Sequence, residues 1–160
     1  MRTLLIMRHG KSSWKDPALA DSERPLKKRG RKDSKSMGKL LDNKKFKPDL
    51  ILCSTALRAK QTAEIVVDEL GFEGQVEYMD ALYMAEPDVI LRVLQHLTDV
   101  ERVMIIGHNP GLEGLTQRLT DKITSLPTAS VVRIKLPINN WQELSFDTTG
   151  ELANLWIPRE

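Results

Sequence analysis

The sequence predicts an α/β fold, in which buried strands of a mostly parallel sheet alternate with helices. Three short apolar runs lack polar alternation, which is typical of strands covered on both faces: residues 3–7, 50–53 and 103–106. Helical patterns lie between these runs, so the order along the chain is strand, helix, strand. The length of 160 residues corresponds to a single domain, residues 1–160, with room for a proper core.

The first two expected helices are marked at their ends. One covers residues 26–42 and follows Pro25, a residue favoured at the start of a helix. The other covers residues 56–70, with Ser54 or Thr55 as its cap and Gly71 as its stop. Each helix therefore comes after an expected strand.

The second half of the chain continues the pattern and then changes. A third helix is expected over residues 88–97, after Pro87. Residues 129–136 and 141–147 alternate more between apolar and polar side chains, and Pro137 and a polar asparagine pair separate them. This predicts edge strands or a hairpin near the C-terminal end.

The composition is that of a folded protein from a reducing compartment. Hydrophobic residues make up 41% of the chain and charged residues 29%, unlike a disordered chain. Cys53 is the only cysteine, so no intrachain disulfide can form. No apolar run approaches the roughly 18 residues of a membrane span. We therefore expect a cytoplasmic protein that does not associate with a membrane.

Basic residues are concentrated in one segment. Residues 24–47 contain eleven of the 24 Lys and Arg residues, although the formal net charge is only +2. Such a run is typical of a solvated helix face, and it also fits a surface that steers acidic or phosphorylated partners toward an anion site. Nucleic-acid binding would call for interleaved aromatic residues and a more basic chain, so we expect no nucleic-acid partner.

Three polar segments follow apolar strands: residues 8–10, 54–58 and 107–111. In open α/β sheets, ligands bind outside the carboxyl ends of the strands, so these segments can converge on one site. Two of them also open helices, whose free N–H groups and positive dipole end favour an anion. The sequence therefore predicts a phosphate pocket.

The residue types in these segments suit phosphoryl transfer. Arg8 and Arg58 would bind the phosphoryl oxygens through their planar, permanently charged guanidinium groups. A neutral imidazole can act as a nucleophile without a metal, and the nearby arginines would help to keep His9 unprotonated. His108 could hydrogen-bond a transferring oxygen and counter its developing charge.

Several blocks resemble the histidine phosphatase superfamily, also called the phosphoglycerate mutase-like superfamily. They are Arg8-His9-Gly10 after the first strand, with Ser12 and Trp14 behind it, then Arg24-Pro25-Leu26 before a helix, the block over residues 54–62, and Gly107-His108-Asn109-Pro110. The resemblance covers nearly the whole chain, with the blocks in family order. It implies a three-layer α/β/α sandwich with a mostly parallel central sheet.

The same resemblance implies roles for individual residues. His9 would be the phosphorylated nucleophile, Arg8 and Arg58 the phosphate ligands, and His108 the second active-site histidine. Four neighbouring residues would contact the substrate: Gly10, Lys11, Ser12 and Asn109. We expect no cofactor and no metal, because the two distant histidines have no carboxylates clustered around them.

Within that superfamily, the length and residues 81–85 look most like the SixA-type phosphohistidine phosphatases. Lys15 stands where the mutase branch usually has Asn, and Tyr83 or Met84 stands where many relatives have an acidic proton donor. The imidazole of a phosphohistidine leaves more easily than an alkoxide, so a missing acid favours that substrate. We therefore expect a hydrolase acting on a phosphorylated partner, such as a histidine-phosphorylated signalling protein.

Two other functions use the same pocket. One is a phosphomonoesterase acting on a small metabolite or a phosphoserine protein, with Glu86 as its proton donor, although Glu86 also fits the start of a helix. The other is a non-catalytic module that binds phosphoproteins.

Two further motifs point to different chemistry and fit less well. The segment from Cys53 to Arg58 resembles the phosphate loop of cysteine phosphatases, but only four residues separate Cys from Arg, so a buried, inert thiol is the better interpretation. Gly10-Lys11-Ser12 resembles the end of a nucleotide phosphate loop, but Leu5 stands at the position of the earlier glycine.

Overall fold

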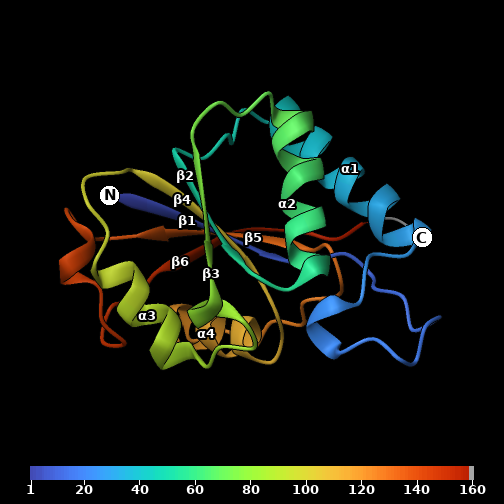
Figure 1. The fold of residues 1–160 in the computed structure, drawn as a ribbon. Coiled ribbons are helices and arrows are strands. Elements are labelled where there is room, and N and C mark those ends of the chain that lie inside the picture. Colours follow the sequence, from blue (N-terminus) through green and yellow to red (C-terminus); the bar gives the residue numbers. More distant parts are fainter. Residues whose placement is uncertain (159–160) are drawn as a thin grey trace.

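A computed structural model describes residues 1–158, in which one six-stranded sheet lies between two layers of helices (Figure 1). The strand order is β3-β2-β4-β1-β5-β6. The strands are β1 (Arg2–Arg8), β2 (Leu50–Ser54), β3 (Gln75–Met79), β4 (Arg102–Gly107), β5 (Val131–Leu136) and β6 (Glu151–Trp156). β1, β2, β3 and β4 run parallel, whereas β5 pairs antiparallel with β1 and with β6.

Four helices cover the sheet, two on each face (Figure 1). On one face lie α1 (Lys28–Asn43) and α2 (Leu57–Leu70), and on the other α3 (Pro87–Gln95) and α4 (Gly111–Thr120). Three short 3-10 turns complete the set: η1 (Asp21–Glu23), η2 (Asp80–Leu82) and η3 (Trp141–Glu143). This is a three-layer α/β/α sandwich, and it confirms the predicted fold class.

The central strands bury both faces, as their unbroken apolar runs predict. Leu5 and Met7 of β1 face the core beneath α1 and α2, and Leu4 and Ile6 face the core beneath α3 and α4. All four are fully buried. β1 is also paired with a strand on each side, so the turn after it is fixed in the middle of the sheet.

Helix α1 begins two residues later than the sequence pattern predicts. Leu26 forms an isolated bridge with Ser12, and its N–H donates to the Gln61 side chain at 2.8 Å. These contacts hold it in extended backbone, so the helix cannot begin there. The cap of α2 differs as well, because Ala56 occupies the N-cap position and the Ser54 hydroxyl accepts its N–H at 3.2 Å.

The expectation of a strand over residues 141–147 is wrong. Trp141 begins η3 instead, and its indole N–H donates to the carbonyl of Val100 at 2.6 Å from a fully buried position. The last strand, β6, follows at Glu151–Trp156 and forms the sheet edge beside β5. The antiparallel pair near the C-terminal end is present, with its second strand later than predicted.

Candidate active site

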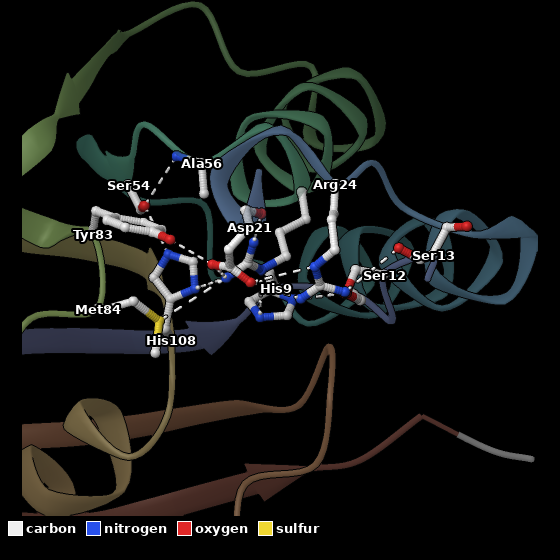
Figure 2. Close-up of polar contacts among 12 residues, drawn as sticks. His9, Ser12, Ser13, Asp21, Arg24, Ser54, Ala56, Tyr83, Met84 and His108 are labelled. Atoms are coloured by element: carbon white, nitrogen blue, oxygen red, sulfur yellow. Dashed lines mark hydrogen bonds and ion pairs between the residues drawn. The ribbon is translucent and has the colours of Figure 1, made fainter. Parts of the chain in front are cut away.

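The candidate site lies where three parallel strands end at one edge of the sheet. His9 follows β1, Ser54 ends β2 and His108 follows β4. Figure 2 shows these side chains converging beside residues from the loop before α1. His9 and His108 line a cavity of about 380 Å³ that also contains three arginines. The convergence follows from topology, because parallel neighbours end on the same side.

His9 presents an unprotonated ring nitrogen to the cavity. Its Nδ1 lies 2.7 Å from the carbonyl oxygen of Gly10. A carbonyl oxygen can only accept, so Nδ1 carries the proton and Nε2 keeps its lone pair. Nε2 accepts from Nε of Arg58 at 3.4 Å. The Nε2 lone pair of His9 is therefore directed toward the guanidinium group of Arg58.

Both imidazoles are neutral at physiological pH. Burial lowers the pKa of His9 to about 4, and the charges of Arg58, Arg8 and Arg24 act in the same direction. Burial also lowers the pKa of His108 to about 3, with further contributions from His9 and Arg58. A neutral His9 has the lone pair that a nucleophile needs.

His108 is held by a serine of the neighbouring strand. Its Nε2 lies 2.7 Å from Oγ of Ser54, and its Nδ1 lies 3.4 Å from Nη2 of Arg58. Because a guanidinium group only donates, Nδ1 is the acceptor and Nε2–H donates to the serine. The His9 and His108 ring centroids are 5.1 Å apart.

Arg58 lies in the first turn of α2 and is only 3% exposed. Its donors reach both imidazoles and also the carbonyl and carboxylate oxygens of Asp21. Met84 approaches from the segment after η2, with its sulfur 3.9 Å from Nη2 of Arg58. Arg58 thus links the two imidazoles to Asp21.

Two further arginines complete the positive lining. Arg8 donates from Nη1 to the carbonyl of Leu126 at 3.0 Å, and its buried Nε has no partner among residues 1–158. Arg24 donates to Oγ of Ser12 at 2.8 Å, and its guanidinium lies 3.6 Å from the ring centroid of Trp14. The cavity is therefore suited to a multiply charged oxyanion.

Asp21 is the functional residue that the sequence interpretation missed. One carboxylate oxygen lies 3.0 Å from Nη2 of Arg58, and the other lies 3.1 Å from Nη2 of Arg24. The Tyr83 hydroxyl donates to it as well. The hydrogen bond from Tyr83, followed by those from Arg58 and Arg24, lowers the pKa of Asp21 to about 2. The carboxylate is therefore an internal counter-ion and not an acid.

Seven of the eight predicted site residues line the cavity: Arg8, His9, Lys11, Ser12, Arg58, His108 and Asn109. Gly10 lies behind it, where its N–H donates to Thr62 at 3.0 Å and its carbonyl orients His9. A side chain at position 10 would approach the carbonyl oxygen of Gly30 to 2.6 Å. Gly10 thus lets the loop that holds His9 pack closely against α1.

Comparison with known proteins identifies the family. The model described as histidine phosphatase superfamily (branch 1) matches residues 4–83. The chain belongs to the histidine phosphatase superfamily. An uncharacterized protein of Mycobacterium leprae is 30% identical over 96% of this chain and 100% of its own length.

Histidine phosphatases of the SixA type are among its relatives. The phosphohistidine phosphatase SixA of Escherichia coli is 34% identical over 67% of both chains. A structure of the protein histidine phosphatase SixA complexed with tungstate has a TM-score of 0.81 and 27% identity, covering 96% of this chain and 95% of that one. The chain thus shares both sequence and fold with histidine phosphatases.

Other groups with reactive side chains lie outside the centre of this site. Glu86 occupies the N-cap position of α3 and borders a separate cavity, together with Asp88 and Arg118. Cys53 is fully buried, and burial raises the pKa of its thiol to about 12. Within residues 1–158, no group of three or more His, Cys, Asp or Glu side chains is placed to hold a metal ion. No helix in the same range is long and apolar enough to cross a bilayer.

Proposed function

We propose that the protein is a phosphohistidine phosphatase that takes the phosphoryl group onto Nε2 of His9 and then releases it to water. The observation that carries the proposal is the tautomer of His9. Its Nδ1–H is held by the carbonyl of Gly10, and Nε2 faces a cavity lined by arginines. The substrate is a phosphorylated side chain of a partner protein.

The first step exchanges one phosphorus–nitrogen bond for another. The lone pair of His9 Nε2 forms a bond to phosphorus, while the bond to the substrate imidazole breaks. When the substrate ring is protonated on its distal nitrogen, it leaves as neutral imidazole and keeps that proton. Arg58 and Arg8 stabilise the charge on the transferring oxygens.

The second step returns the enzyme to its starting state. Water attacks phosphorus, and the electron pair of the phosphorus–nitrogen bond returns to Nε2 of His9. The product is dihydrogen phosphate, which carries both hydrogens of the water. The phosphoryl charge would raise the pKa of His108, and a proton on its Nδ1 would then donate to a transferring oxygen.

The carboxylates near the site favour a phosphoramidate over a phosphate ester. An alkoxide leaving group needs a proton donor, whereas a protonated imidazole does not. Asp21 lines the cavity as an ionised group, because its partners lower its pKa to about 2. Glu86 borders a different cavity. The names of the SixA relatives support the same substrate class.

The test compares wild type with His9→Ala on a synthetic phosphohistidine peptide and on p-nitrophenyl phosphate, in excess chelator. We expect phosphate release mainly from the peptide, its loss in His9→Ala, and a trapped phosphoryl group that is stable in alkali and lost in acid. His96→Ala removes an exposed histidine and should retain full activity, so it is the matched control.

Several results would contradict the proposal. Faster release from the ester would favour a phosphomonoesterase. Binding of the peptide without turnover would favour a non-catalytic module. Activity in His9→Ala would refute the covalent intermediate on His9. Loss of wild-type activity in the chelator would show that the reaction needs a metal.

A further inference from the structure

Helix α1 carries a row of cations along one face, here called the basic stripe: Lys28, Arg31, Lys32, Lys35 and Lys39. These residues are spaced three or four apart, so their side chains lie on the same side of the helix. All of them are exposed. With a rise of 1.5 Å per residue, the row is about 16 Å long.

The opposite face of α1 is committed to the core. Its buried residues are Gly30, Asp33, Ser34, Met37, Gly38 and Leu41. This division fixes the rotation of the helix, so the basic stripe must face outward. Lys35 lies 3.9 Å from a carboxylate oxygen of Glu69. The other four cations form no ion pair within the part of the chain that the structure describes.

The helix that carries the basic stripe starts against the loop that lines the active-site cavity. Lys11 lines that cavity, and its carbonyl accepts the N–H of Lys27 at 2.9 Å. Gly30 allows the closest approach, since a Cβ there would lie 2.2 Å from the same carbonyl oxygen. The first turn of α1 therefore packs directly on the loop that holds the nucleophile. The N-terminal end of the helix that carries the stripe is therefore tied to a loop that lines the cavity.

The charge of the whole chain is strongly divided. Residues 24–47 contain eleven Lys and Arg and only two acidic residues, a net charge of +9. The whole chain has a net charge of +2, so the remaining residues sum to −7. A long polyanion that extends beyond residues 24–47 would be repelled by the net negative charge of the remaining chain. A short acidic segment can bind to the stripe alone.

We infer that the basic stripe is a docking surface for an acidic segment of the phosphorylated partner, located beside its phosphohistidine. The inference rests on the proposed function and adds a substrate class to it. The partner's acidic residues lie along α1 while its phosphoryl group enters the cavity. Charge pairing at such a rim mainly raises the association rate, so it should appear in kcat/KM and be sensitive to salt.

The test uses two phosphohistidine peptides that differ only in the flank, which is a run of glutamates in one and of glutamines in the other. For wild type at low salt, we expect kcat/KM to be on the order of tenfold higher for the acidic peptide. High salt should remove most of this preference. In the triple variant Lys28→Glu, Lys32→Glu, Lys39→Glu, the preference should vanish or reverse while the glutamine peptide is turned over as before.

A second triple variant is the control for net charge. Lys44→Glu, Lys45→Glu and Lys122→Glu change the same number of exposed charges away from the stripe, and the acidic preference should remain. Thermal melts of both variants check that folding is intact.

The outcomes separate the two proposals. If wild type turns over neither peptide, the proposed function fails. If it turns over both equally, or if the two triple variants behave alike, the docking surface is refuted and the phosphatase stands. Stronger inhibition by short duplex DNA or by phosphatidylserine vesicles than by an unphosphorylated acidic peptide would assign the stripe to a different macromolecule and overturn the inference.

Discussion

Nη2 of Arg58 lies 3.0 Å from a carboxylate oxygen of Asp21, so the arginine beside His9 is already paired with an anion of the protein. The same arginine approaches Nε2 of His9 through its Nε. A phosphoryl group must therefore share Arg58 with Asp21 or displace it. This relationship makes Asp21 a determinant of anion affinity.

Replacing Asp21 with Asn should tighten the binding of inorganic phosphate. The variant keeps the shape of the side chain and removes its charge. The Asp21 side chain is 46% exposed, so solvent screens it, and we expect a gain of about fivefold, equivalent to about 1 kcal/mol. Titration calorimetry measures the change. Asp16→Asn, in the same loop, is the control for net charge, and weaker binding by Asp21→Asn would show that the carboxylate mainly positions Arg58.

Replacing Arg58 with Lys should lower kcat on the phosphohistidine peptide by about 10²- to 10³-fold, even though the positive charge remains. An ammonium group cannot span both imidazoles and Asp21 as the planar guanidinium does. Steady-state kinetics provide the measurement. Lys60→Ala, two residues further along α2, should stay within about twofold of wild type. Retained activity in Arg58→Lys would mean that charge alone is sufficient.

Replacing Ser54 with Ala should lower kcat more than it raises KM. The serine accepts Nε2–H of His108 at 2.7 Å and holds the ring in one orientation. It is a positioning residue, and its loss should cost about 1 kcal/mol of transition-state stabilisation, or about fivefold in kcat. Ser54→Thr should restore most of the rate. An effect on KM alone would contradict this role.

Acid should destabilise the folded protein through its active-site histidines. The pKa values of His9 and His108 are about 4 and about 3 in the folded protein, and both residues titrate near 6.5 when unfolded. Between these values the unfolded chain binds more protons, so the free energy of unfolding falls as the pH drops from about 6.5 toward 4.

Urea unfolding at about pH 7 and pH 4.5 tests this. His108→Gln should reduce the difference in unfolding free energy between the two pH values by on the order of 2 kcal/mol. His96→Gln, at an exposed histidine, is the matched control. An undiminished pH dependence in His108→Gln would argue that His108 is not held neutral in the folded state.

Local pattern predicted much of the fold because the buried strands have unbroken apolar runs, with Leu4 to Met7 as the clearest case. The position of β6, which follows residues 141–147, could not be predicted from local pattern. Alternation over residues 141–147 favours a strand, but the contact of Trp141 with the carbonyl of Val100 is set by a partner 41 residues away. Such long-range packing overrides the local period.

In the site, too, residues marked by local sequence could be predicted, and residues placed by distant contacts could not. His9, Arg58 and His108 could be predicted because each follows a strand within a recognisable block. Asp21 begins the short turn η1, and Tyr83, which donates to it, is 62 residues away. Its position three residues before Arg24 was the only signal in the sequence. Ser54 or Thr55 was predicted to cap α2, but the contact of Ser54 with His108 depends on how β2 and β4 align.

The burial of Cys53 has a consequence for how the protein responds to oxidants. Peroxide and alkylating reagents attack thiolates, and this thiol is fully covered and stays protonated at physiological pH. An enzyme that works through the His9 imidazole would keep its activity under oxidative stress that inactivates cysteine-based phosphatases. Phosphate removal by this route would then not depend on keeping a cysteine reduced.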